Sequence, residues 1–96
     1  MDIDERAQRL LEVTKKFIIG KDMDCHLIQD INTLDCNGKN GVLVLQIVYP
    51  KNPDKLDADM CLELGDYELN MCEEYFKYYT LTPMVLRFQE FIANKG

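Results

Sequence analysis

The sequence predicts an α+β fold with an N-terminal helix, a three-stranded antiparallel meander and two C-terminal helices, in the order α-β-β-β-α-α. Apolar residues recur at helical spacing near both ends of the chain, whereas its middle is rich in β-branched residues. A segment dense in glycine and asparagine, typical of a hairpin connection, precedes the β-branched run. Because the chain has 96 residues and 47% of them are apolar, we expect a single domain spanning residues 1–96.

The first helix is expected over residues 3–18. Its apolar positions follow the helical period and comprise Ile3, Ala7, Leu10, Leu11, Thr14, Phe17 and Ile18. Aspartate is a preferred N-cap and glycine a common residue just after a helix. We therefore expect Asp2 to cap this helix and Gly20 to follow its end.

The next two elements are expected to form a hairpin. Residues 42–49 are rich in β-branched side chains and are followed by Pro50, a pattern that predicts a strand. Residues 36–41 read Cys-Asn-Gly-Lys-Asn-Gly and tolerate the positive φ angles of a tight connection. Because a hairpin needs a strand on each side, we assign at least residues 29–36 to the other strand. Residues 24–30 fit either a strand or a helix.

The strand at 42–49 is apolar on both faces. One face carries Val42, Val44 and Val48, and the other carries Leu43, Leu45, Ile47 and Tyr49. A strand of this kind requires cover on both sides. Either two helices of the chain sandwich the sheet or a second copy covers one face, and we expect a homodimer.

The C-terminal half is expected to contain one more strand and two helices. After a loop at 50–58, apolar residues alternate over 60–64 and predict the third strand. Helical spacing returns at residue 68, with Leu69, Cys72, Tyr75, Phe76 and Tyr79 on its inner face. A break is expected at residues 80–81. Thr82 followed by Pro83 then begins the closing helix, as an N-cap and a first helical position.

Negative charge is concentrated in one segment of this acidic chain. The net charge is −6, and residues 54–74 contain eight acidic residues and one lysine, which gives this segment −7. Phosphate and anionic lipid are both recognised by clustered basic residues, so direct binding to nucleic acid or to a membrane is disfavoured. A basic protein partner is favoured, because opposite charge accelerates its approach.

We expect a partner-binding surface in this segment and at the adjoining Tyr78, since tyrosine is enriched at interface hot spots. The candidate residues are Asp54, Asp57, Asp59, Glu63, Asp66, Glu68, Glu73, Glu74 and Tyr78. The alternative is that these acids form a solvated face without a partner.

The sequence predicts no catalytic, cofactor or metal site. Cys25, Cys36, Cys61 and Cys72 lack the close pairing of zinc ligands, so we interpret them as small buried hydrophobic residues. The acidic N-terminus is unlike a signal peptide. We therefore expect reduced thiols and a cytoplasmic location. The sole histidine, His26, points away from Cys25 if both lie on a strand. No glycine-rich phosphate loop or EF-hand spacing is present in the sequence.

Two functions fit these observations. The first is a small acidic protein-binding module, an inhibitor or immunity-type protein that docks on a basic, nucleic-acid-binding partner protein. The second is a structural or chaperone-like homodimer without an enzymatic role. The layout is similar in general form to secretion chaperones, immunity proteins and phage-encoded inhibitors, and a likeness of form does not by itself carry function.

Overall fold

The computed structural model describes residues 4–34 and 40–95, and for residues 31–34 and 40 it describes the backbone only. Its elements are α1 (Glu5–Phe17), β1 (Asp24–Leu34), β2 (Asn40–Tyr49), β3 (Ala58–Glu63), α2 (Asp66–Leu69), α3 (Glu73–Phe76) and α4 (Thr82–Lys95). A 3-10 turn at Pro53–Lys55 precedes β3, and a π-helical segment at Lys77–Leu81 joins α3 to α4. The predicted α+β order, one helix followed by three antiparallel strands and then helices, is confirmed.

The N-terminal helix begins later than predicted. Asp4, rather than Asp2, is its N-cap, and the Asp4 carboxylate accepts a hydrogen bond of 2.8 Å from the backbone N–H of Arg6. The buried face of α1 consists of Ala7, Leu10, Leu11 and Thr14. Gly20 follows the helix with a φ of +83°, a conformation that glycine adopts without strain.

The three strands form one antiparallel sheet in the order β1-β2-β3. β1 begins at Asp24, so residues 24–30 belong to a strand and not to a helix. In the register, Leu45 of β2 lies opposite Leu27 on one side and Leu62 on the other. Gly41 has a φ of +92°, and a Cβ there would lie 2.8 Å from the side-chain nitrogen of Gln29, so this position requires glycine. Residues 35–39 of the predicted hairpin connection lie outside the described range.

The helix predicted from residue 68 is interrupted at residues 70–72, and the break predicted at 80–81 is absent. The short helix α2 ends at Leu69, and the chain is then helical from Glu73 to Lys95. Phe76 and Leu81 are both fully buried, yet five residues of α-helix would rotate them about 140° apart. The wider π-helical turn, with its i→i+5 bonds, brings both side chains to the core.

Thr82 and Pro83 therefore lie inside a continuous helical stretch. The Thr82 hydroxyl donates a hydrogen bond of 2.8 Å to the carbonyl of Lys77, five residues earlier, and does not cap a new helix. Pro83 has no N–H to donate to the carbonyl four residues earlier. The π-helical register next to this proline accommodates the missing donor.

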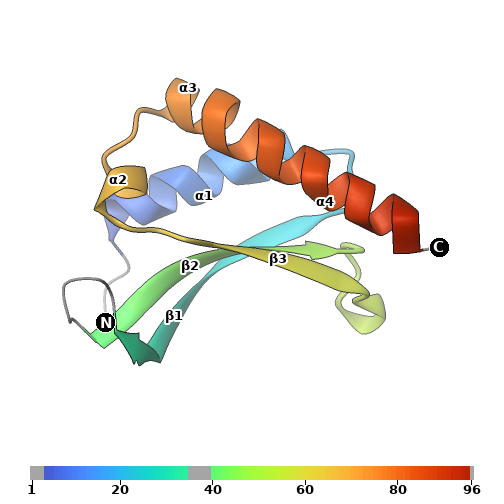
Figure 1. Ribbon diagram of the computed structural model, residues 1–96, viewed down its shortest axis with the longest axis horizontal. Coiled ribbons are helices and arrows are strands. Elements are labelled where there is room, and N and C mark those ends of the chain that lie inside the picture. The colour runs from blue at the N-terminus through green and yellow to red at the C-terminus, as the bar shows by residue number, and fades with distance from the viewer. Residues whose placement is uncertain (1–3, 35–39, 96) are drawn as a thin grey trace.

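The α-helices of the described chain lie on one face of the sheet (Figure 1). α1 packs over β1, and α4 runs above β3, where it shares a groove with that strand. The largest fully buried side chains between the two layers are Phe76, Phe88, Leu10, Leu45, Ile47, Leu81 and Val85. Within residues 4–34 and 40–95, helices therefore do not sandwich the sheet. No helix in these ranges is long and apolar enough to cross a membrane.

Three side chains predicted for the inner face of the C-terminal helices are exposed. Tyr75 and Tyr79 are 43% and 68% exposed, and their ring centroids lie 4.5 Å apart on the surface. Cys72 is also exposed and forms the N-cap of α3. The prediction failed because α3 begins only at Glu73 and the π-helical segment changes the period after it, so that Phe76 is the one side chain of α3 that reaches the core.

Candidate functional site

The face of the sheet opposite the helices, here called the open face, is built from alternate residues of the three strands. Their sequence neighbours Cys25, Leu45 and Met60 pack into the helix-covered core, and side chains of a strand alternate between its two sides. Among the strand residues whose side chains are described, those on the open face are Asp24, His26, Ile28, Asp30, Val42, Val44, Gln46, Val48, Asp59, Cys61 and Glu63.

The strand register arranges most of these residues in three rows across the sheet. The rows are Asp24–Val48–Asp59, His26–Gln46–Cys61 and Ile28–Val44–Glu63. The central residue of each row comes from β2, and the outer two come from β1 and β3. A valine therefore occupies the centre of the first and third rows, while a glutamine occupies the centre of the second.

Two apolar areas lie along the middle of the open face. Ile28 is 38% exposed beside the half-buried Val44. At the other end, Leu56 from the loop before β3 is 54% exposed and lines a groove with Val48 and His26. Ile28 and Leu56 supply the exposed apolar surface of these areas, because Val42 and Val48 are themselves buried.

A polar network crosses the open face between the two apolar areas. The Gln46 amide nitrogen donates to the Asp59 carboxylate at 2.8 Å, which turns the Gln46 amide oxygen toward His26 Nε2. Because that oxygen can only accept, His26 Nε2 carries the proton of this bond. The network fixes one side chain from each strand relative to the others.

Every acidic residue of the three strands lies on the open face. The strands contain Asp24 and Asp30 in β1 and Asp59 and Glu63 in β3, and their sequences contain no lysine or arginine. The first and third rows thus place carboxylates beside central valines. The charge follows the alternation of the strands, with acids on one face and apolar side chains on the other.

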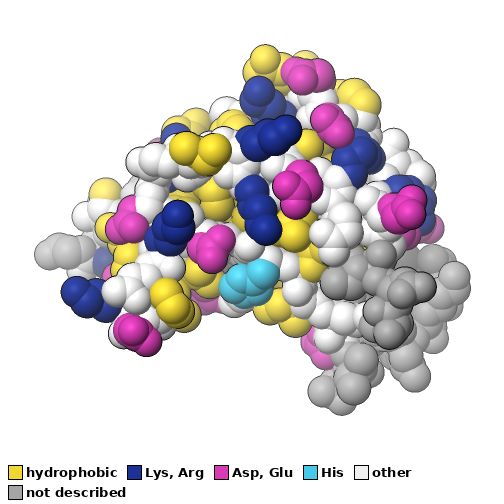
Figure 2. All heavy atoms as spheres, turned by 180° about the vertical axis from the view of Figure 1, so that it is seen from behind, with side chains coloured by type: hydrophobic (Ala, Val, Ile, Leu, Met, Phe, Trp, Pro, Cys, Tyr) yellow, Lys and Arg dark blue, Asp and Glu magenta, His cyan; other side chains and the backbone are white. Residues whose placement is uncertain are grey.

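Basic residues border the edges of this face. Lys15 and Lys51 line a groove with Asp24, and Arg87 of α4 lines another groove with Asp59. Glu63 lines neither of these grooves. On the side of the molecule seen in Figure 2, acidic and basic side chains are interspersed around the single histidine. Mixed signs on that side contrast with the strands, whose charged side chains are all acidic.

The structure brings only part of the predicted acidic segment to the open face. Asp59 and Glu63 lie on it. Asp57 lines the groove of Leu56, and its carboxylate forms an ion pair of 3.0 Å with Lys95 of α4. Asp54 lies in the exposed 3-10 turn before β3.

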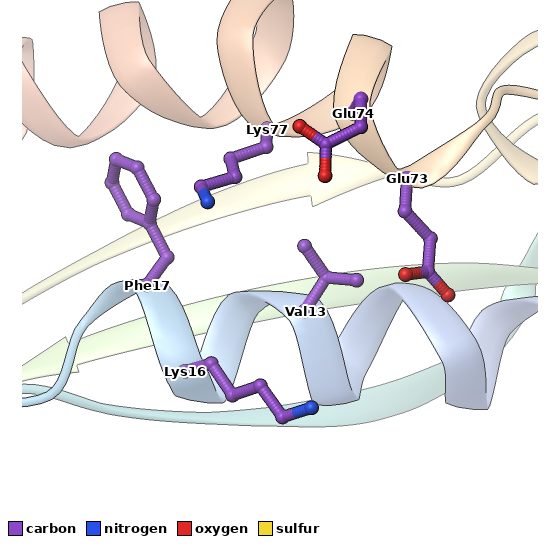
Figure 3. Close-up of a pocket in the computed structure, with 6 residues that line it drawn as sticks. All are labelled: Val13, Lys16, Phe17, Glu73, Glu74 and Lys77. Atoms are coloured by element: carbon purple, nitrogen blue, oxygen red, sulfur yellow. The ribbon is translucent and has the colours of Figure 1, made fainter.

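The remaining predicted acids lie on the helical layer. Asp66 is the first residue of α2, and Glu68 accepts a hydrogen bond of 2.9 Å from the backbone N–H of Gly65 at the start of the same helix. Glu73 and Glu74 line a groove between α1 and α3, in which Val13, Lys16, Phe17 and Lys77 are the other lining residues (Figure 3). The two lysines offset the charge of the two glutamates locally. The segment 54–74 therefore forms two separate surfaces.

Tyr78 belongs to the helical layer as well. It is 60% exposed, and the Lys77 ammonium lies 5.8 Å from its ring centroid. A second aromatic group lies nearby, where a hydrogen bond between Tyr67 and Tyr75 raises the pKa of Tyr75. These tyrosines are exposed, but the structure separates them from the acids of the sheet.

Asp24 and Asp30 are functional candidates that the sequence analysis did not include. Their signal is an alternation, Asp24-x-His26-x-Ile28-x-Asp30, which places all four side chains on one face of a strand. This signal was hidden because residues 24–30 also fit a helix. Only the pairing with β2 shows that these residues share a face with Asp59 and Glu63.

The exposed thiol on the open face is not activated as a nucleophile. Partial burial and the neighbouring Asp59 carboxylate raise the pKa of Cys61, which disfavours the thiolate. Cys25 is buried on the covered side, and burial raises the pKa of its thiol to about 11. The buried-cysteine interpretation holds for Cys25 and is wrong for Cys61 and Cys72, which are exposed. Cys36 lies outside the described residues.

Within the described part of the chain, no cluster of three or more His, Cys, Asp or Glu side chains is placed to hold a metal ion. Comparison of the chain with protein-family models, with curated proteins and with solved structures finds no match.

Proposed function

We propose that this protein is a small acidic protein-binding module that docks the open face of its sheet on a basic partner protein. The observation that carries the proposal is the gathering of Asp24, Asp30, Asp59 and Glu63 on one face that the described helices leave uncovered. Carboxylates on both outer strands attract a cationic surface, and the exposed side chains of Ile28 and Leu56 offer apolar surface to bury on contact.

The open face suits this role better than the helical layer does. Glu73 and Glu74 share their groove with two lysines, and Glu68 is engaged at the start of α2. On the open face, side chains of the central strand are uncharged and the acids stand on the strands beside it. The strands therefore present only acidic charge to a basic partner, with Lys15, Lys51 and Arg87 at the borders of the face.

If the partner binds nucleic acid, docking on its cationic surface would mask that surface from phosphate. An inhibitor or immunity-type protein would act in this way, since the same lysines and arginines cannot serve both ligands at once. Attraction between opposite charges would make the association fast and sensitive to salt.

The proposal is tested with a charge-reversal variant, Asp24→Lys with Glu63→Lys, here called the sheet-face variant. These two acids come from opposite edges of the sheet, and neither belongs to the His26–Gln46 network. The matched control is Glu12→Lys with Glu90→Lys, which makes the same change in net charge at exposed positions of α1 and α4.

Affinity capture from host lysate at low salt is expected to yield a stoichiometric basic protein with the wild type and with the control. The sheet-face variant is expected to lose that protein. The wild type is expected to lose it when the salt concentration is raised, because the contact is electrostatic. Recovery of the same partner with all three proteins, or of no partner with any of them, would contradict the proposal.

A further inference from the structure

We infer that the occupant of the open face is an amphipathic α-helix of the partner that carries lysine or arginine along both sides of an apolar stripe. This inference rests on the proposed function and adds the shape and chemistry of the partner segment. The helix would lie along β2, with its stripe on the two apolar areas and its basic side chains toward the acids of β1 and β3.

The backbone of the sheet favours a helix over an extended segment. From Val44 to Val48, β2 is paired with β1 on one side and with β3 on the other, so this part of the open face presents side chains and no free backbone groups. A segment that lies on this face must satisfy its own backbone hydrogen bonds. A helix does so internally and buries one stripe of side chains against the sheet.

The width of the face fits a single helix. Asp24 and Asp59 flank Val48 in the same row, two strand spacings apart, which corresponds to about 10 Å. A helix with its side chains is about 10–12 Å across. Basic residues on its two sides would therefore reach the carboxylates while its apolar stripe contacts the centre of the sheet.

The length of the face also fits. The exposed side chains of the two apolar areas are Leu56, which lies beside the buried Val48, and Ile28, which lies beside Val44. Val44 and Val48 are four residues apart along β2. Four residues of strand span about 13 Å, which a helix covers in about nine residues, or two and a half turns. A helix of three or more turns would therefore contact both apolar areas and the polar network between them.

Charge distinguishes this occupant from a second copy of the chain. Two open faces packed together would bring the carboxylates of Asp59 and Glu63 toward those of the partner copy, and like charges across an interface are costly. A cationic helix meets the same carboxylates with opposite charge. The acids thus favour a different, basic chain over self-association.

The test uses two synthetic peptides of about 18 residues with the same leucine and lysine content. In the first, the leucines form one helical stripe flanked by lysines; in the second, the same residues are shuffled so that no stripe exists. Binding is followed by fluorescence anisotropy, and the contact surface is mapped by NMR chemical shifts of the labelled protein.

The striped peptide is expected to shift the amide signals of Ile28, Val44 and Leu56 and to bind at least about tenfold more tightly than the shuffled peptide. Its affinity is expected to fall at least about tenfold for the sheet-face variant and by less than about twofold for the control variant. The protein alone is expected to remain monomeric in sedimentation at the concentrations used.

Three results would overturn the inference. Equal binding of both peptides would show that the face attracts basic chains without recognising a helix, and signals that shift only on the helical layer would place the contact elsewhere. A concentration-dependent dimer that shifts the open-face signals would make a second copy the occupant. If both peptides bind equally but the sheet-face variant still loses the captured partner, the proposed function stands and only the inference about a helix fails. The failure of the inference is therefore distinguishable from the failure of the proposed function.

Discussion

The two faces of the sheet are built by the same strands yet have opposite character. Leu45 and Ile47 on the covered face are fully buried beneath the helices, whereas Ile28 on the open face is 38% exposed. The covered face contributes to a continuous apolar core, and the open face carries every carboxylate of the strands. One set of alternate residues therefore packs under the helices, whereas the other leaves its acids and Ile28 exposed, although Val42 and Val48 of this second set are also buried.

The largest expected effect is on stability, and it is seen by comparing substitutions of two neighbouring residues on opposite faces of the sheet. Leu45→Ala leaves a cavity between the sheet and the helices and is expected to lower the free energy of unfolding by about 2–5 kcal/mol. Val44→Ala removes partly exposed methyl groups and is expected to cost about 1 kcal/mol or less. Urea unfolding followed by circular dichroism measures both. Equal losses would show that the open face contributes to the core as much as the covered face does.

The next effect concerns the two thiols that lie on opposite faces. Burial raises the pKa of Cys25 to about 11, above its value of about 8.5 in an unfolded chain. Because the folded protein holds this proton more tightly, the stabilisation is complete below about pH 8.5 and is lost as the pH rises through about 11. Cys61 is shifted in the same direction, but it is exposed.

Cys25→Ala is therefore expected to flatten the fall in unfolding free energy between about pH 8.5 and 11 more than Cys61→Ala does. Urea unfolding under reducing conditions at several pH values in this window measures the slopes. If the wild type and Cys25→Ala lose stability in parallel, the Cys25 thiol is not protected by the fold.

The smallest expected effect is on the stability of the sheet-face variant. Asp24 and Glu63 are exposed, and the Asp24 carboxylate accepts a hydrogen bond of 2.8 Å from the backbone N–H of Cys25. Loss of this bond together with two exposed charges is expected to change the free energy of unfolding by about 1 kcal/mol or less. A thermal melt should therefore superimpose on that of the wild type within a few degrees, as should that of the control variant. A large drop in melting temperature would mean that these acids support the fold and that lost binding cannot be assigned to charge alone.

Part of this organisation could be predicted from local sequence patterns. The period of Leu10, Leu11 and Thr14 predicts the buried stripe of α1, and β-branched residues predict β2. The alternation within β2 also predicts which side chains share a face. These features depend on residues a few positions apart, and local geometry is enough to fix them.

The candidate site was predicted only in part, because its members come from distant segments. Asp59 and Glu63 were included on the basis of local charge, while Asp24 was not, although the register places it level with Asp59. The same charge argument also selected Glu73 and Glu74, which the fold places in a groove with two lysines. Net charge along the chain does not distinguish acids that share a surface from acids that face bases.

The order of helices and strands and the division of each strand into two sets of side chains follow from local sequence, because both depend on periods of a few residues. Tertiary packing, in contrast, places α1 and α4 on the same face of the sheet, which no local period specifies. It also decided the π-helical segment, because burying both Phe76 and Leu81 overrides the local helical period. The alternation in the strands decides which side chains share a face, and the packing of the helices decides which of the two faces stays open.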